Sequence, residues 1–263
     1  MVGGLSALLT LGLPVFASVA PELKHTGLEL PAAPARGMGS DAIVPDPTRE
    51  RDRPLVVAQE PVLLVMGDSL SAAFGIPLQR GWVALLAERL RATGSSLRVV
   101  NASVSGETTQ GGLTRLPSEL ARNRPALVVI ELGANDGLRG QPLEAMRDNL
   151  RRMVRLSHEA GARVLLLGMR IPPNYGPQYG EQFFRSFESV ASETGVPLVP
   201  FFLEKVALHP EMMQDDGLHP TAAAQVHLLD TVWPALRPLL RKTSPGRPKQ
   251  TADALPTSAP VNR

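Results

Sequence analysis

The sequence of 263 residues contains no cysteine. A cysteine nucleophile, a thiolate-ligated metal site and disulfide bonds are therefore excluded, although a protein without disulfides can still be exported. Aromatic residues make up only 4% of the chain, and no stretch of the central part interleaves them with basic side chains. The sequence thus gives no indication of a nucleic-acid-binding surface.

An excess of either charge is also missing from the central part of the chain. Residues 61–240 hold 17 basic and 17 acidic side chains and carry no net charge. The basic excess lies in residues 241–263, where Asp253 is the one acidic side chain beside five basic ones: Arg241, Lys242, Arg247, Lys249 and Arg263. The pI near 9.3 therefore reflects a basic tail, which we expect to be solvated.

No hydrophobic run is long enough to span a bilayer comfortably. Residues 4–17 (GLSALLTLGLPVFA) are uncharged and apolar but short for that purpose. Val15-Phe16-Ala17 fits the small-x-small cleavage pattern of a signal peptide, although no Lys or Arg precedes the run. We predict that residues 1–20 form a signal peptide or apolar N-terminal segment, and that the protein is periplasmic or secreted without stable membrane insertion.

Prolines cluster on both sides of the neutral central part. Residues 21–60 contain six prolines and no sustained apolar period, and residues 241–263 contain four prolines. Segments of this composition do not build a packed core. The sequence therefore predicts a disordered spacer over 21–60, a disordered tail over 241–263 and one folded domain over 61–240.

Within this domain, short apolar runs alternate with helical stripes. The runs are rich in Val, Ile and Leu and bounded by Gly, Pro or Asn, which is typical of parallel strands covered on both faces: Val62–Met66, Leu97–Val100, Ala126–Leu132, Arg163–Met169 and Pro197–Phe202. Helical periodicity starts at Trp82, Leu113, Met146 and residue 178, and again over 221–240, where Pro234 is expected to bend or end the helix. We predict a three-layer α/β/α sandwich with a mainly parallel, flavodoxin-like five-stranded sheet, whose site lies at the carboxyl ends of the strands.

The first predicted strand runs into Gly67-Asp68-Ser69-Leu70. Gly67 permits a sharp turn, and Ser69 falls where a strand gives way to a loop or helix. The N–H of Ser69 would then point into the site, where it can bind a developing oxyanion. Taken alone, Ser after Gly-Asp is equally typical of an ordinary turn.

Two further motifs follow the second and third predicted strands. Asn101–Thr108 (NASVSGET) contains Gly106, which allows close backbone approach and frees an N–H for a ligand. Gly133–Gly137 (GANDG) contains Asn135, whose amide is a neutral donor suited to an oxyanion. Each motif alone is equally compatible with a plain loop or a tight turn.

The last motif is Asp216-Gly217-Leu218-His219-Pro220. Asp and His three residues apart can place the carboxylate beside Nδ1, which orients the imidazole and stabilises its charged form. Asp215 is an alternative partner, but the spacing favours Asp216. No further His or Cys cluster supports a metal site at these residues, so neither a metal nor a cofactor is expected.

Together the four motifs resemble those of the GDSL, or SGNH, hydrolases, which are named for Ser, Gly, Asn and His. These match Ser69, Gly106, Asn135 and His219, and Asp216 completes the resemblance. Longer stretches, such as residues 66–72 (MGDSLSA) and 213–220 (MQDDGLHP), are similar to the periplasmic multifunctional thioesterase I, lysophospholipase and arylesterase subfamily. The resemblance covers about residues 61–240.

The resemblance implies a serine esterase. Ser69, Asp216 and His219 would form the triad, and Ser69, Gly106 and Asn135 the oxyanion hole. The substrates implied are small acyl esters, thioesters or lysophospholipids, and we expect a monomer. Apolar loop residues after the third and fourth strands are candidates for an acyl groove: Leu138, Ile171 and Tyr175. A carbohydrate O-acetylesterase and a non-catalytic acyl- or glycan-binding module are the alternatives.

Overall fold

The computed structural model describes residues 60–240. Five strands form one parallel sheet in the order β2-β1-β3-β4-β5. The strands are short, as predicted, and their bounds are β1 Val62–Gly67, β2 Arg98–Asn101, β3 Leu127–Glu131, β4 Arg163–Leu167 and β5 Leu198–Val199. The predicted parallel five-stranded sheet is confirmed, with the strand order of flavodoxin-like folds.

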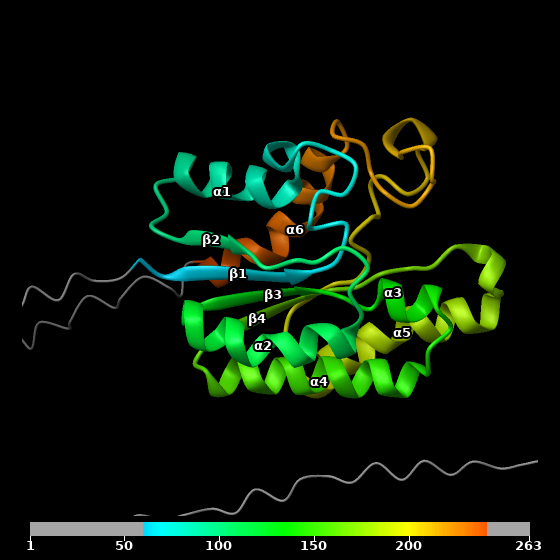
Figure 1. The fold of residues 1–263 in the computed structure, drawn as a ribbon, viewed down its shortest axis with the longest axis horizontal. Helices are drawn as coiled ribbons and strands as arrows, with labels where there is room; N and C mark the ends of the chain where they lie inside the picture. The colour runs from blue at the N-terminus through cyan, green and yellow to red at the C-terminus, as the bar shows by residue number, and fades with distance from the viewer. Residues whose placement is uncertain (1–59, 241–263) are drawn as a thin grey trace, which may run out of the picture. The chain divides into compact units, whose positions relative to one another are not determined.

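Helices cover both faces of the sheet (Figure 1). Helices α1 and α6 pack together on one face, whereas α2, α4 and α5 cover the other. The longer helices are α1 Trp82–Ala92, α2 Thr109–Asn123, α4 Leu143–Glu159, α5 Pro177–Thr194 and α6 Gln225–Leu240, and a single turn, α3 Ala134–Leu138, follows β3. The predicted three-layer sandwich is therefore confirmed.

The core lies on both sides of the central strands. All six residues of β1 and all five of β3 are buried, because each strand is covered by helices on both faces. The largest buried side chains come from the helices and from the loop after β5: Trp82, Phe183, Phe187 and Phe202. This packing fixes the carboxyl ends of β1 and β3, between which the strand order reverses.

Pro234 lies within the final helix. Helix α6 continues through Pro234 to Leu240, so of the two expected outcomes, a bend or an end at Pro234, the helix does not end there. Proline removes the hydrogen bond to the carbonyl four residues earlier, which here belongs to Asp230. The Lys205 ammonium donates to that oxygen at 3.2 Å, and Pro234 is exposed to solvent, so the lost bond is replaced at the surface.

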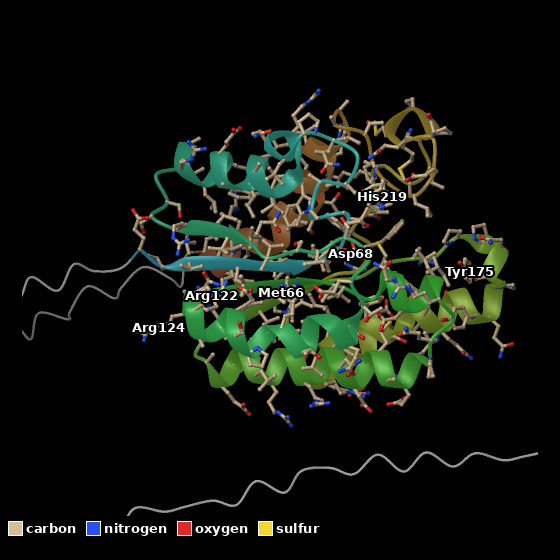
Figure 2. All side chains as sticks on the ribbon, in the orientation of Figure 1. Met66, Asp68, Arg122, Arg124, Tyr175 and His219 are labelled. Atoms are coloured by element: carbon tan, nitrogen blue, oxygen red, sulfur yellow. The ribbon has the colours of Figure 1, made fainter. Side chains whose placement is uncertain are left out.

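Both ends of the described chain lie at the amino edge of the sheet. Glu60 lies two residues before β1. The Arg163 guanidinium, at the start of β4, donates to the carbonyl of Leu239 near the end of α6. Figure 2 shows Arg122 and Arg124, where α2 ends, at this edge and away from His219. The predictions for residues 1–20, for most of the 21–60 spacer and for the tail over 241–263 concern residues outside this description.

Candidate active site

The four sequence motifs meet at the carboxyl edge of the sheet. Ser69 follows β1, Gly106 lies in the loop after β2, and Asn135 lies in α3 directly after β3. His219 comes from the loop that precedes α6, and Figure 2 shows it beyond the end of β1, near Asp68. This is the switch point at which flavodoxin-like sheets bind their ligands.

Ser69, His219 and Asp216 form a continuous chain of hydrogen bonds. The Ser69 Oγ lies 2.8 Å from His219 Nε2, and His219 Nδ1 lies 2.6 Å from Asp216 Oδ2. The imidazole can therefore accept a proton from the hydroxyl while the carboxylate fixes the other ring nitrogen. The structure thus brings together the three residues that the sequence singles out for this role.

A closed loop holds Asp216 and His219 in place. Met213 and Pro220 form an isolated antiparallel bridge, and the Gln214 N–H donates to the His219 carbonyl at 2.7 Å. Within the loop, Gly217 has a φ of +65°, a left-handed conformation that favours glycine. The sequence Asp-Gly-Leu-His therefore folds back so that its carboxylate reaches its own imidazole.

Hydrogen bonds to Asp216 keep it ionised. Its Oδ1 accepts the backbone N–H groups of His219 and Leu218 at 3.0 and 2.9 Å. These two bonds, followed by the bond to the His219 ring, lower the pKa of Asp216 to about 2. Asp215, the alternative partner, makes no hydrogen bond or ion pair with any residue of the described range.

Ser69, Gly106 and Asn135 line the same cavity, and each offers a hydrogen-bond donor there. Within residues 60–240, no acceptor takes the backbone N–H of Ser69 or of Gly106. Gly106 has a φ of +77°, and its carbonyl accepts the Arg139 guanidinium at 2.9 Å, which fixes the peptide orientation. The Asn135 amide donates one N–H to Asp68 Oδ2 at 3.0 Å, which leaves its second N–H for a ligand. Such a set of donors can bind an oxyanion.

Replacing Asn135 by alanine should lower kcat by about 10²–10³-fold with little change in KM, because an oxyanion donor acts mainly in the transition state. Steady-state hydrolysis of an aryl ester by the purified variant measures this loss. Asn123→Ala is the control, because the side-chain hydrogen bonds of Asn123 within residues 60–240 go to Glu119 of its own helix. A decrease in kcat of less than tenfold for Asn135→Ala would show that Asn135 is not an oxyanion donor.

An apolar cavity of about 230 Å³ opens beside Ser69 and His219. Leu138 and Ile171, two of the three residues predicted to line an acyl groove, border this cavity. Tyr175 does not border it, but the Tyr175 hydroxyl donates to the Leu138 carbonyl at 2.9 Å and so supports the cavity wall. The remaining apolar lining comes from five elements or loops: Leu70, Phe74, Ala134, Met169, Pro172, Leu203 and Leu218.

Phe74 and Asp68 also line the cavity, although the sequence predicted a role for neither side chain. The Phe74 ring lies 4.5 Å from the His219 ring, centroid to centroid, and is half exposed at the cavity mouth. The Gln214 amide donates to the Phe74 carbonyl at 2.9 Å and joins this loop to the His219 loop. No periodicity or motif marks Phe74, because its position depends on contacts between two loops.

Asp68 is almost fully buried beside Ser69 and Asn135. Burial raises its pKa from 3.8 to about 6, against the opposing effects of the Leu70 N–H, the His219 charge and the Asn135 amide. Since the native protein then binds a proton more tightly than the unfolded chain does, ionisation of Asp68 opposes folding.

For Asp68 we expect the unfolding free energy to decrease as the pH rises from about 4 to about 6, the interval between its unfolded and native pKa values. Asp68→Asn removes this titration, so the stability of wild type relative to the variant should fall across that interval. Urea unfolding at a series of pH values measures the difference. Asp148→Asn, at an exposed position of α4, is the control, and a pH-independent difference for Asp68→Asn would contradict the assignment.

Two negative findings concern the described residues. Within residues 60–240, no three His, Asp or Glu side chains are grouped so that they could hold a metal ion. In the same range, no helix is long and apolar enough to cross a membrane.

The chain is similar in sequence and in structure to known proteins. Residues 65–226 match the GDSL-like Lipase/Acylhydrolase family model. Esterase TesA of Pseudomonas aeruginosa is 56% identical over 178 residues, which cover 68% of this chain and 89% of TesA. A crystal structure of TesA aligns with a TM-score of 0.67 and 56% identity, covering 68% of this chain and 99% of that structure.

Two other relatives carry different names. An arylesterase of Vibrio mimicus is 46% identical over 65% of this chain and 85% of the relative. Thioesterase 1/protease 1/lysophospholipase L1 of Escherichia coli K12 is 43% identical over 69% of this chain and 86% of the relative. Each alignment covers most of the relative's length.

Proposed function

Because the chain belongs to the GDSL-like lipase/acylhydrolase family, we propose that Ser69, His219 and Asp216 are its catalytic triad. The chain is a hydrolase of ester bonds, as the names esterase, arylesterase and thioesterase of its relatives indicate. The observation that carries the proposed triad is the hydrogen-bond chain from Ser69 through His219 to Asp216.

In the first half-reaction, Ser69 Oγ attacks the acyl carbon while His219 Nε2 takes its proton. The carbonyl oxygen becomes an oxyanion, which the N–H groups of Ser69 and Gly106 and the Asn135 amide bind. His219 then gives its proton to the leaving alkoxide or thiolate as the bond to the acyl carbon breaks. An acyl-enzyme remains on Ser69.

In the second half-reaction, a water molecule attacks the acyl-enzyme and gives its proton to His219. The same donors bind the second oxyanion, and His219 returns the proton to Ser69 as the carboxylic acid leaves. Asp216 stays ionised throughout, because its backbone hydrogen bonds hold its pKa near 2. Neither half-reaction requires a cofactor.

The substrates proposed are aryl esters, acyl thioesters and lysophospholipids. Leu138, Ile171 and their apolar neighbours form a cavity wall suited to an acyl chain rather than to a sugar ring. Hydrolysis rates for a panel of purified substrates, varying acyl length and ester against thioester, test this assignment. Preference for acetyl esters of carbohydrates over longer acyl chains would favour an O-acetylesterase instead.

A fluorophosphonate probe tests whether the site is catalytic at all. It should label Ser69 covalently, and His219→Ala should slow the labelling because the hydroxyl loses its base. A protein that neither reacts with the probe nor hydrolyses any ester would be a binding module.

The location proposed is the periplasm or the extracellular space, and the proposed form is a monomer. The apolar run over residues 4–17 and the small-x-small pattern at Val15–Ala17 support export. Cell fractionation with N-terminal sequencing tests the location, and light scattering of the purified protein tests the oligomeric state. Recovery in the cytosolic fraction with residues 1–20 intact would contradict export.

A further inference from the structure

Glu131, the last residue of β3, is a buried carboxyl group that the proposed mechanism leaves unused. Its side chain has no exposure to solvent, and no cation pairs with it anywhere in residues 60–240. Buried charges are normally paired, so an isolated buried carboxyl group beside an active site needs a physical explanation. The contacts of Glu131 supply one.

One oxygen of Glu131 holds the turn that carries Ser69. Glu131 Oε2 accepts the Ser71 hydroxyl at 2.7 Å and the Asp68 backbone N–H at 3.2 Å. These two donors lie on either side of Ser69 in the sequence. The Trp82 indole N–H donates in turn to the Ser71 oxygen at 3.1 Å, which ties the same turn to the start of α1.

Asp68, whose backbone N–H binds Glu131 Oε2, carries a second buried carboxyl group beside Glu131. Two carboxyl groups this close do not both ionise readily, because the negative charge of one disfavours ionisation of the other. Glu131 Oε1 is buried and has no hydrogen-bond partner within residues 60–240, which disfavours the ionised form because a buried carboxylate oxygen without donors is costly.

The surroundings place a proton on Glu131 rather than on Asp68. Burial and the negative charge of Asp68 raise the pKa of Glu131 well above its usual range. Asp68, in contrast, accepts hydrogen bonds from the Leu70 N–H and the Asn135 amide and interacts with the His219 charge, all of which favour its ionised form.

We propose that Glu131 is a positioning residue that acts as a neutral carboxylic acid and joins the Ser69 turn, through Asp68, to the amide of Asn135. The inference rests on the proposed function of Ser69 and Asn135. Because Asp68 accepts the Asn135 amide at 3.0 Å, one buried network fixes both the nucleophile and an oxyanion donor.

Gly67 packs directly against this network. A Cβ atom at Gly67 would lie 2.7 Å from Glu131 Oε2 and 2.7 Å from the Ser71 hydroxyl oxygen, closer than real Cβ contacts allow. The space beside β1 is therefore filled by the Glu131 carboxyl group, which explains a glycine at this position in terms of packing rather than backbone angles.

Glu131→Gln tests whether Glu131 acts as a neutral or as a charged group. In Glu131→Gln, the amide oxygen can accept from Ser71 and Asp68, and the NH₂ group can donate to the Asp68 carboxylate. We expect kcat of this variant to stay within about 3-fold of wild type, whereas Glu131→Ala should lower kcat by about 100-fold with little change in KM, because the reacting groups lose their alignment.

Controls separate positioning from loss of stability. Ser186→Ala removes a buried hydroxyl of α5 away from the site and should leave kcat unchanged while its thermal unfolding is recorded beside the others. If Glu131→Ala does not fold, Ser71→Ala serves in its place, and we expect its kcat to fall tenfold or more. Infrared spectroscopy of wild type and Glu131→Gln gives a measurement that does not depend on catalysis. A protonated-carboxyl C=O band at neutral pH should be present in wild type and absent in Glu131→Gln.

The proposal is overturned if Glu131→Gln loses as much kcat as Glu131→Ala, if Glu131→Ala or its substitute Ser71→Ala keeps full activity, or if the infrared difference lacks the protonated-carboxyl band. Failure of the proposed function is distinguished by Ser69→Ala, assayed in parallel. Full activity of Ser69→Ala would refute the triad, whereas an inactive Ser69→Ala beside a fully active Glu131→Ala would refute only the role of Glu131.

Discussion

Replacing Ser69 by alanine is expected to lower kcat for ester hydrolysis by about 10⁵–10⁶-fold, the size of the effect seen when the nucleophile of a serine hydrolase triad is removed. The Ser69 Oγ is the atom placed 2.8 Å from the imidazole, and alanine has no atom to form the acyl-enzyme. The remaining donors can still bind an oxyanion, so a small rate above the uncatalysed reaction should persist. Stopped assays at high enzyme concentration measure it.

Ser118→Ala is the matched control for Ser69→Ala. Ser118 is exposed on α2, remote from the carboxyl edge, and its loss should leave kcat and fluorophosphonate labelling unchanged. Mass spectrometry should find the labelled peptide in Ser118→Ala and none in Ser69→Ala. Equal esterase activity in Ser69→Ala and wild type would defeat the acyl-enzyme mechanism.

Replacing Asp216 by asparagine is expected to lower kcat by about 10⁴-fold, because an amide in place of the carboxylate favours the wrong imidazole tautomer. Asp216 Oδ2 lies 2.6 Å from His219 Nδ1, and two backbone N–H groups bind its other oxygen. Asparagine preserves the size of the side chain, so the loss should appear in kcat with little loss of stability. Steady-state kinetics and thermal unfolding of the same preparation separate the two effects.

Asp215→Asn is the control that decides between the two adjacent carboxylates. Asp215 is exposed and contacts no other described residue through hydrogen bonds or ion pairs, so its replacement should change kcat by less than about 3-fold. If Asp215→Asn were the more damaging variant, the loop around His219 would have to adopt a different arrangement during catalysis.

The fold was predictable because each element has a regular signal. The buried runs at β1 and β3 are continuous Val, Ile and Leu segments, and the stripe from Trp82 to Leu90 matches a helix face. The bounds differ by a residue or two, except for β5, where only Leu198–Val199 of the predicted Pro197–Phe202 pairs with β4. Apolar side chains alone do not specify where backbone pairing ends.

The residues of the candidate triad were also accessible from the sequence, since Ser69 and the Asp216–His219 pair occur in short motifs. The groups around them were not. Glu131 resembles any other residue at a strand end, and its hydrogen-bond partners Ser71 and Asp68 are 60 and 63 positions away in the chain. Likewise, Lys205 donates a hydrogen bond to the Asp230 carbonyl that Pro234 leaves without its helical partner. This bond joins a loop to a helix, and no local sequence pattern predicts it.

The placement of both described chain ends at the amino edge of the sheet has a practical consequence. Glu60 and Leu239 lie across the domain from Ser69, so an affinity tag, a fusion partner or a solid support joined directly to either end of a domain trimmed to residues 60–240 would be attached at the edge opposite the Ser69 cavity. Immobilised through such an attachment, the trimmed domain would present the apolar cavity beside Ser69 outward to the bulk medium.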